Sequence, residues 1–295
     1  MKLAAIDIGS NAARLLIADV LHYKNQPPEF IKSNLVRVPL RLGFDVFETG
    51  AISPLKAQQL LETIKAYKLL LNAYGIKYVK ACATSAMRDA QNSKEIIQKI
   101  KDETGIEIEI ISGDLEATLI YETHIAEGLN KENLHMYIDV GGGSTEITFF
   151  QNGELLYKHS FNIGTIRILK QQVKEAQWEE MKDYIRTHTR HEKKIVAIGS
   201  GGNINKVFSL SKKKEGRPLP LSLLRDYYKE LSHLTVQERM RLYKMREDRA
   251  DVIVPALLIY TNILKWAGAT EILIPKIGLV DGLVRTLDED ILHNL

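Results

Sequence analysis

The sequence lacks several features that would place the protein outside the cytoplasm or give it redox chemistry. Its one cysteine, Cys82, cannot form an internal disulfide and stands in the apolar run YVKACATS, where a buried structural thiol is expected rather than a nucleophile. Its two tryptophans, Trp178 and Trp266, are expected to be packing residues on helices. No run of about 18 apolar residues is present to span a bilayer, and the start, MKLAAIDIGSNAARLL, has no long apolar stretch typical of a signal peptide. We therefore expect a cytoplasmic protein with no membrane partner.

An excess of charge of either sign is also missing. The net charge is only +3, which gives no reason to expect a nucleic-acid partner. The two densest basic stretches, 189–194 and 211–217, carry no interleaved aromatic residues for base stacking. We expect both to be solvated loops, with a rim that attracts a polyanion as the alternative. The close pair His188 and His191 has no supporting ligand set, so no zinc site is predicted.

The composition that remains, 45% hydrophobic and 26% charged, is that of an ordinary globular protein. Apolar runs and turn residues predict an antiparallel meander that is followed by alternating strands and helices. A helix is expected over 53–74, because Ser53 precedes Pro54 and an apolar stripe follows. The stripe consists of Leu60, Leu61, Ile64, Leu69 and Leu71. The other elements predicted for this half are strands at 3–8, 13–20, 30–38, 78–83 and 106–111, and helices at 93–104 and 114–127.

One supersecondary unit occurs twice. The segment MYIDVGGGSTEITFF can be laid over LAAIDIGSNAARLLI without a gap, which pairs Asp139 with Asp7 and Glu146 with Arg14. A repeat about 130 residues apart predicts two similarly folded domains rather than a solenoid. We expect a first domain over 1–128 and a second over 129–295, divided near 128–133, with a terminal helix that either completes the second domain or packs back on the first. Further strands are predicted at 154–161, 194–199 and 271–275.

In both copies an aspartate ends a strand, and a glycine-containing turn leads into another strand. The turn is therefore a hairpin, and neither the dinucleotide fingerprint nor the Walker loop, which both open a helix, fits it. Glycines let several backbone N–H groups point to one side, so a phosphate can approach closely. A plain tight turn is the alternative for one copy, and the presence of two copies favours phosphate binding. Carboxylates beside phosphate repel it unless a cation lies between them, so Asp7 and Asp139 predict a hard metal, most simply Mg²⁺, unless each only caps its own turn.

Six segments occur in the order typical of one known family: AIDIGSNAARLLI, ATSAMRDAQN, ISGDLEATLIYE, YIDVGGGSTEITFF, NIGTIRI and IGSGGN. The chain resembles the exopolyphosphatase and guanosine pentaphosphate phosphohydrolase family over nearly its whole length. That family belongs to the actin-like superfamily of sugar kinases, actin and heat-shock-70 ATPase domains. The resemblance implies an α/β fold of two ribonuclease H-like domains with an interdomain cleft, in which facing hairpins hold the phosphates of a linear chain. It is to the short form, without additional C-terminal helical domains.

The resemblance also implies residue roles. Glu116 matches the catalytic general base, and Glu146 with Asp139 matches the acids that orient the attacking water or its metal; Asp7 and Asp139 are the implied metal ligands. From the residues alone, Glu116 reads as a surface charge on an amphipathic helix, and each arginine as a surface ion pair. Arg167 is a weaker phosphate-binding candidate than the others. The implied phosphate-binding residues are Gly9, Ser10, Asn11, Arg14, Ser85, Arg88, Gly141, Gly142, Gly143, Ser144, Thr145 and Arg249.

Three positions depart from the family pattern: Ala12 stands where a hydroxyl residue is usual, Asp114 and Leu115 stand where glutamates are common, and GSGGN replaces a threonine-rich loop. The predicted activity is Mg²⁺-dependent release of orthophosphate from inorganic polyphosphate, from guanosine pentaphosphate or from both. The alternatives are an ATP-dependent small-molecule kinase and a sensor that binds a guanosine polyphosphate with little turnover. A homodimer is expected on base rates alone.

Overall fold

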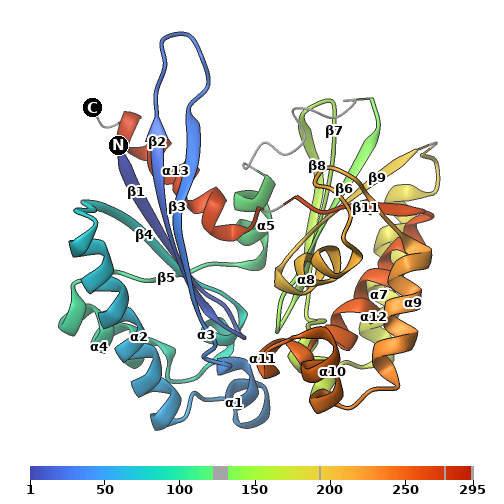
Figure 1. Cartoon of the computed structure of the whole chain (residues 1–295), viewed down its shortest axis with the longest axis horizontal. Helices are drawn as coiled ribbons and strands as arrows, with labels where there is room; N and C mark the ends of the chain where they lie inside the picture. Colours follow the sequence, from blue (N-terminus) through green and yellow to red (C-terminus); the bar gives the residue numbers. More distant parts are fainter. Residues whose placement is uncertain (122–131, 193, 276, 294–295) are drawn as a thin grey trace. The chain divides into compact units, whose positions relative to one another are not determined.

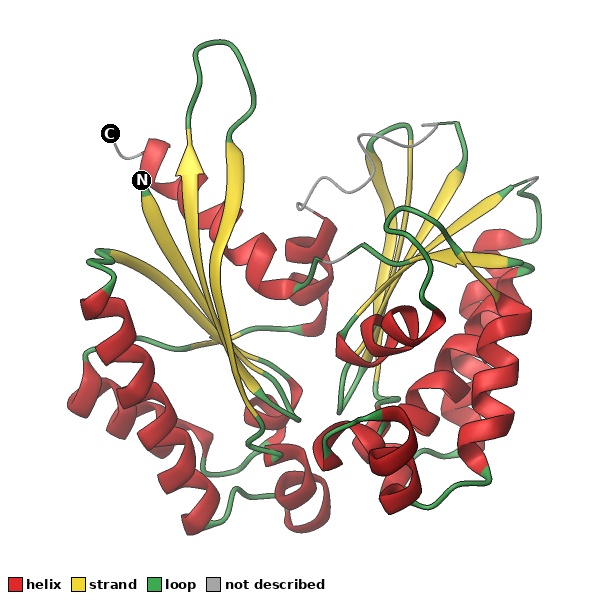
Figure 2. Cartoon of the chain, viewed as in Figure 1, coloured by secondary structure: helices red, strands yellow, loops and turns green. Residues whose placement is uncertain are grey.

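The computed structural model describes residues 1–121, 132–192, 194–275 and 277–293 (Figures 1 and 2). The chain divides into two compact units: unit 1 is Met1–Thr123 with Gly278–Leu295, and unit 2 is His124–Ile277. The boundary predicted near 128–133 falls largely on 122–131, which lie outside the described residues. Each unit is built on its own mixed sheet, and each is considered by itself below.

The sheet of unit 1 has the strand order β3-β2-β1-β4-β5. Strands β1 to β3 form the antiparallel meander that the sequence predicts, and β4 and β5 add parallel to β1. This order is the ribonuclease H-like one, so the predicted fold class is confirmed. The strand expected over 106–111 is reduced to two residues. The bounds are β1 Lys2–Ile8, β2 Ala13–Leu21, β3 Glu29–Val38, β4 Tyr78–Ala83 and β5 Glu109–Ile110.

Helices cover both faces of this sheet (Figure 2). Helix α13 packs on β1, β2 and β4 together with α5, so the C-terminal helix belongs to the first unit. The two helices approach so closely that a Cβ on Gly282 would lie 2.0 Å from the carbonyl oxygen of Leu119. The described helices of unit 1 are α1 Leu42–Thr49, α2 Pro54–Ala73, α3 Ser85–Asp89, α4 Ser93–Thr104, α5 Gly113–Tyr121 and α13 Leu279–His293.

Helix α2 begins as predicted, because the Ser53 hydroxyl accepts a hydrogen bond from the Lys56 amide and Pro54 occupies the first helical position. Its predicted apolar stripe is wrong at one position, since Leu69 is 70% exposed. The buried position on that turn belongs to Tyr67, whose hydroxyl donates to the carbonyl oxygen of Ala13 at 3.1 Å. A phenol can cover the sheet while its polar end finds a partner, which the apolar pattern does not reveal.

Read from its other end, the sheet of unit 2 repeats that order as β8-β7-β6-β9-β11, and β10 adds one extra strand beside β11. Strands β6 to β8 are antiparallel neighbours, and β9 pairs parallel with both β6 and β11. The predicted repeat is thus a repeat of strand order. The bounds are β6 Leu134–Val140, β7 Thr145–Gln151, β8 Glu154–Phe161, β9 Ile195–Ser200, β10 Leu219–Pro220 and β11 Glu271–Leu273.

Helix α12 forms the centre of the unit 2 core, and ten of its residues are buried. The segment Glu247–Ala267, which includes α12, is by length and composition capable of crossing a membrane, but 67% of its apolar window is buried inside the protein. This burial is that of a core helix of unit 2. Trp178 and Trp266 pack edge to face at 6.1 Å, as predicted. The described helices are α6 Thr165–Leu169, α7 Glu175–Thr189, α8 Gly202–Ser211, α9 Leu221–Ser232, α10 Val236–Tyr243, α11 Glu247–Ala250 and α12 Ile253–Ala267.

Candidate active site

The two glycine hairpins are built in the same register. Asp7 on β1 lies opposite Arg14 on β2, and Asp139 on β6 lies opposite Glu146 on β7. The gap-free overlay of the two segments places the first of these cross-strand pairs on the second. The last rung but one of each hairpin therefore carries an aspartate, and the two hairpins differ in the charge of the residue across from it.

Each turn is closed in the same way. The amide of Gly9 donates to the carbonyl oxygen of Ala12 at 3.1 Å, and the amide of Gly141 donates to that of Ser144 at 2.9 Å. Both turns lead directly into a strand, as the sequence predicts. The geometry of a phosphate loop that opens a helix is therefore absent from these two described turns.

In unit 2, the start of α6 holds the carbonyl side of the glycine turn. The three bonds run from Thr165 N to Gly141 O (3.1 Å), from Ile166 N to Gly142 O (2.8 Å) and from Arg167 Nε to Gly143 O (2.7 Å). In a trans peptide unit the N–H of the next residue points away from the carbonyl. Within the described ranges, the amides of Gly142, Gly143 and Ser144 donate to no other group. The turn thus presents three adjacent N–H donors, as an anion-binding loop does.

In unit 1, the start of α1 holds the first turn in a similar way. The amide of Gly43 donates to the Ser10 carbonyl at 2.8 Å, and the amide of Arg41 donates to the Asn11 carbonyl at 2.9 Å. The Ser10 hydroxyl lies 2.8 Å from the hydroxyl of Ser85, the first residue of α3. The structure therefore brings together two predicted phosphate-binding residues that are 75 positions apart.

Asp7 is compensated inside unit 1 by Arg14. The Arg14 guanidinium lies 2.6 Å from the Asp7 carboxylate, which is only 2% exposed. Burial raises the pKa of Asp7 and the nearby Arg14 charge lowers it, with burial the larger effect. Arg14 stays about one third exposed at its side chain. The predicted metal ligand of this unit already has a cation beside it, so a metal ion would share the carboxylate with the guanidinium.

Asp139 and Glu146 face each other with hydroxyl partners instead. The Ser200 hydroxyl donates to Asp139 at 2.6 Å, and the Ser160 hydroxyl donates to Glu146 at 2.8 Å. Oxygens of the two carboxylates lie within 4.8 Å of each other. Two acids at this spacing repel unless a proton or a cation lies between them, and carboxylate oxygens suit a hard cation. The donor set of unit 2 therefore fits a hard cation.

A glycine beside Asp139 keeps its carboxylate accessible. Gly201 has φ +103°, a conformation that L side chains rarely adopt, and a Cβ there would lie 3.1 Å from the carboxylate oxygen Oδ1 of Asp139. Gly201 also caps α8, whose second residue is Asn203. The GSGGN segment thus lets the chain turn into a helix next to a charged group.

Glu116 lies in the first turn of α5. The Ser112 hydroxyl caps that turn by accepting from the Leu115 amide at 3.1 Å, and the Glu116 amide donates to the Ser112 carbonyl at 3.0 Å. Glu116 is only 8% exposed, so the surface-charge interpretation is wrong.

Burial raises the pKa of Cys82 well above its usual value, and the nearby Asp7 and Glu116 charges raise it further. Cys82 is therefore a buried, protonated thiol, as predicted.

Four predicted phosphate-binding side chains make contacts inside their own units. Arg88 donates to the Ile111 carbonyl at 2.9 Å, and the Thr145 hydroxyl donates to the Ile163 carbonyl at 2.6 Å. Arg249 donates to the Asn203 side chain at 2.8 Å and lies over Gly202, where a Cβ would meet the guanidinium at 2.5 Å. Arg14 contacts Asp7, as described above.

Several residues that complete the site were not predicted. Ser160 lies directly across from Glu146 on β8, and Gly164 packs so tightly on the glycine turn that a Cβ would lie 2.4 Å from the Gly142 carbonyl oxygen. Ser200 stands in the GSGGN segment that the sequence singles out, so a local signal existed for it. Gly164 likewise stands in the NIGTIRI segment, whereas Ser160 carries no such signal, because its role comes from a tertiary contact.

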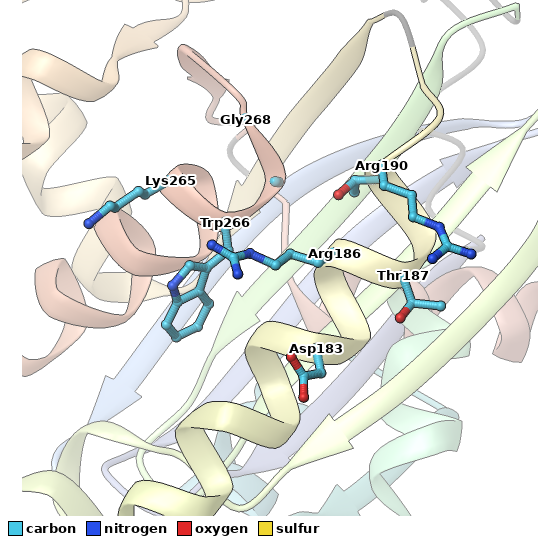
Figure 3. Close-up of a pocket in the computed structure, with 9 residues that line it drawn as sticks. Asp183, Arg186, Thr187, Arg190, Lys265, Trp266 and Gly268 are labelled. Atoms are coloured by element: carbon cyan, nitrogen blue, oxygen red, sulfur yellow. The ribbon is translucent and has the colours of Figure 1, made fainter.

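A cavity of about 630 Å³ is found elsewhere on unit 2, between the ends of α7 and α12 (Figure 3). Its walls include Arg186, Arg190, Lys265 and Trp266. In Figure 3 the Lys265 and Arg190 side chains extend to opposite sides instead of converging on one point. The cavity contains no hairpin residue, so the candidate site rests on the hairpins and not on this hollow.

Comparison with known proteins agrees with this geometry. The sequence profile of the Ppx/GppA phosphatase family matches residues 24–289. The chain is 29% identical over 305 aligned positions to the bifunctional 3-dehydroquinate synthase/phosphatase of Fusobacterium nucleatum, covering 92% of this chain. It is 24% identical to exopolyphosphatase 1 of Mycobacterium tuberculosis, covering 98% of this chain. It spans 44% of the length of the first relative and 89% of the second.

A solved structure supports the same grouping. The crystal structure of an exopolyphosphatase from Cytophaga hutchinsonii superposes with a TM-score of 0.83 and 26% sequence identity. The match covers 98% of each chain. The fold and the sequence profile therefore point to one family.

Proposed function

This chain belongs to the Ppx/GppA phosphatase family, and from that premise we propose that it is a phosphoanhydride hydrolase. It releases terminal orthophosphate from inorganic polyphosphate, from guanosine pentaphosphate or from both. The observation that supports this most is the pair of glycine hairpins in one register, each with an aspartate on its last rung but one. A hydrolase of phosphoanhydrides needs positioned donors, charge neutralisation and a proton acceptor more than it needs covalent chemistry.

The backbone of the two turns binds the phosphates. In unit 2 the donors are the N–H groups of Gly142, Gly143 and Ser144, whose carbonyl sides are held by α6. In unit 1 the turn at Ser10 lies against the start of α3 at Ser85. Donors that are already fixed need no reorganisation when negative charge builds up on the phosphoryl oxygens, and this lowers the barrier.

The acidic residues have the remaining roles. Glu116 accepts the proton of the attacking water, because a carboxylate in a mostly buried position can be held at the reacting group as a general base. Glu146 orients that water, with its own carboxylate held by the Ser160 hydroxyl. The aspartate of each hairpin, Asp7 in unit 1 and Asp139 in unit 2, would hold Mg²⁺, which would neutralise charge on the phosphate.

The decisive experiment is an orthophosphate-release assay with polyphosphates of several lengths and with guanosine pentaphosphate, with and without Mg²⁺. Glu116→Gln should lower turnover by a factor of about 100 or more while substrate binding persists. Asp114→Asn is the matched control, because Asp114 is an exposed acid in the same helical turn, and it should retain activity.

The outcomes separate the alternatives. Full turnover by Glu116→Gln would show that the assigned base is wrong. Tight binding of a guanosine polyphosphate without release of phosphate from any substrate would favour a sensor. Formation of ADP from ATP only in the presence of a small acceptor would favour a kinase.

A further inference from the structure

Arg167 bonds to the glycine turn from behind. Its Nε donates to the carbonyl oxygen of Gly143 at 2.7 Å across 24 positions of sequence. Its main chain is fixed at both ends, since its amide lies 3.4 Å from the Gly142 carbonyl and its own carbonyl accepts from Gln172 at 2.9 Å. The guanidinium therefore reaches the turn from an anchored backbone.

The bond determines the direction of one particular donor. Because a peptide unit is planar and trans, holding the Gly143 carbonyl also sets the direction of the Ser144 N–H on the opposite side of that plane. The other two donors of the turn, Gly142 N–H and Gly143 N–H, are set in the same way by backbone amides of α6. Only the third peptide unit depends on a side chain.

In the first hairpin, the carbonyl groups of the turn are held by backbone amides and not by a side chain. Ser10 and Asn11 occupy the positions of Gly142 and Gly143, and both of their carbonyls accept from backbone amides at the start of α1. The use of a guanidinium in unit 2 is therefore specific to that turn, and a substitution can remove it. A bond from a charged donor is also stronger than one between neutral amides.

We propose that Arg167 is a positioning residue: it does not contact the phosphate, and it aims the Ser144 N–H at it. The proposal rests on the proposed phosphate-binding function of the turn. It differs from the sequence-based expectation for Arg167, which placed its guanidinium on the phosphate itself. A guanidinium that donates to Gly143 O through Nε holds the far side of the turn from the three N–H donors.

Three measurements on Arg167→Gln, Arg167→Lys and a control test this. The first is amide hydrogen exchange at Gly141 and Ile166 without ligand, because these amides donate to the Ser144 and Gly142 carbonyls and so report the turn alone. The second is binding of methylenediphosphonate, a phosphate pair that cannot be hydrolysed. The third is kcat and KM for polyphosphate. Arg190→Gln is the control, because Arg190 is an exposed arginine of the same unit outside the hairpin.

We expect Arg167→Gln to speed exchange at Gly141 and Ile166 and to weaken methylenediphosphonate binding about tenfold, a loss typical of one charge-assisted bond. Arg167→Lys should recover part of both, since a lysine can still donate to the carbonyl. Gly164→Ala acts on the same turn, so its loss of binding and that of Arg167→Gln should not add in the double variant.

Three results would overturn the proposal. Unchanged exchange at Gly141 and Ile166 with greatly weakened binding would place Arg167 on the phosphate, and additive losses in the double variant would do the same. Unfolding of Arg167→Gln at a much lower denaturant concentration than Arg190→Gln, with normal exchange at Gly141 and Ile166, would leave only a general structural role. A wild-type protein that binds no diphosphonate would contradict the proposed function instead, while the exchange result would still decide how the turn is held.

Discussion

Asp139 lies across from Glu146 on the last but one rung of one hairpin, whereas on the same rung of the other hairpin the Arg14 guanidinium lies 2.6 Å from the Asp7 carboxylate. The two hairpins share strand register and turn closure, but the residue across from the aspartate is basic in one hairpin and acidic in the other. One rung pairs an acid with a guanidinium, and the other places two acids side by side, each bonded to a serine hydroxyl. Carboxylate oxygens suit a hard cation, so we expect the cation dependence of the protein to originate in unit 2.

Mg²⁺ should stabilise the wild-type protein against heat and should do so much less in Glu146→Gln. Without the cation, Glu146→Gln should be the more stable protein by about 1 kcal/mol, because it removes the repulsion between two facing carboxylates. Melting curves with MgCl₂, and with NaCl at the same ionic strength, measure both effects. Glu154→Gln, an exposed acid on β8, is the control. An equal shift of the melting temperature in all three proteins would place the cation elsewhere.

The Asp7–Arg14 pair predicts a pH-dependent defect. Burial already raises the pKa of Asp7, and Arg14→Gln removes the charge that lowers it, so the pKa should rise further. The buried carboxylate then destabilises the fold at every pH above its folded-state pKa, and this cost disappears as the pH falls toward the unfolded value of 3.8. Urea unfolding at neutral pH should show a loss of about 2 kcal/mol, reduced from that of a fully buried pair because Arg14 is partly exposed. The double variant Asp7→Asn/Arg14→Gln should recover most of it, and a loss that does not change with pH would contradict this account.

Much of the fold follows from local pattern. The hairpins, the start of α2 at Ser53 and the antiparallel meander of unit 1 could be predicted, because turn glycines, caps and alternating apolar residues act over a few positions. Helix α1 was missed because it begins at Arg41 in a left-handed conformation with no side-chain cap, so its start carries no usual signal. Leu69 was misplaced because helical spacing alone does not say which side of a stripe meets the sheet.

The site was predictable to the extent that it is local. The two turns and their aspartates are contiguous segments, so their residues could be identified directly. Glu116 could be identified only through the family resemblance, since its burial depends on packing around α5. The role of Ser160 and the bond from Arg167 to Gly143 depend on tertiary contacts, and no spacing in the sequence reveals them.

His135 should make unit 2 less stable in mild acid. Its side chain is 1% exposed and stacks on Phe150 at 4.9 Å, and burial lowers its pKa below 6.5. The folded-state pKa of His135 lies below its unfolded-state pKa, so the unfolded chain takes up the proton first as the pH falls. The free energy of unfolding therefore decreases as the pH falls from the unfolded-state pKa to the folded-state pKa. We expect wild-type unfolding free energy to drop by about 1 kcal/mol or more between about pH 7 and about pH 5, and His135→Phe to remove much of that drop. His191→Gln, at an exposed site, should leave the drop unchanged. The same drop in His135→Phe would mean that another group causes it.

Gly164→Ala should damage the site without unfolding the protein. The added methyl group would lie 2.4 Å from both the carbonyl oxygen of Gly142 and the carbonyl carbon of Gly143, which are backbone atoms and cannot rotate away. The glycine turn must therefore shift, and with it the three N–H donors. Because a small misplacement of fixed donors is costly to catalysis, orthophosphate release should fall about tenfold or more, with the helix content seen by circular dichroism retained. Gly278→Ala is the control, since a Cβ there meets nothing within 4 Å. Full activity in Gly164→Ala would show that the turn tolerates displacement, and phosphate binding by its fixed N–H groups would then have to be abandoned.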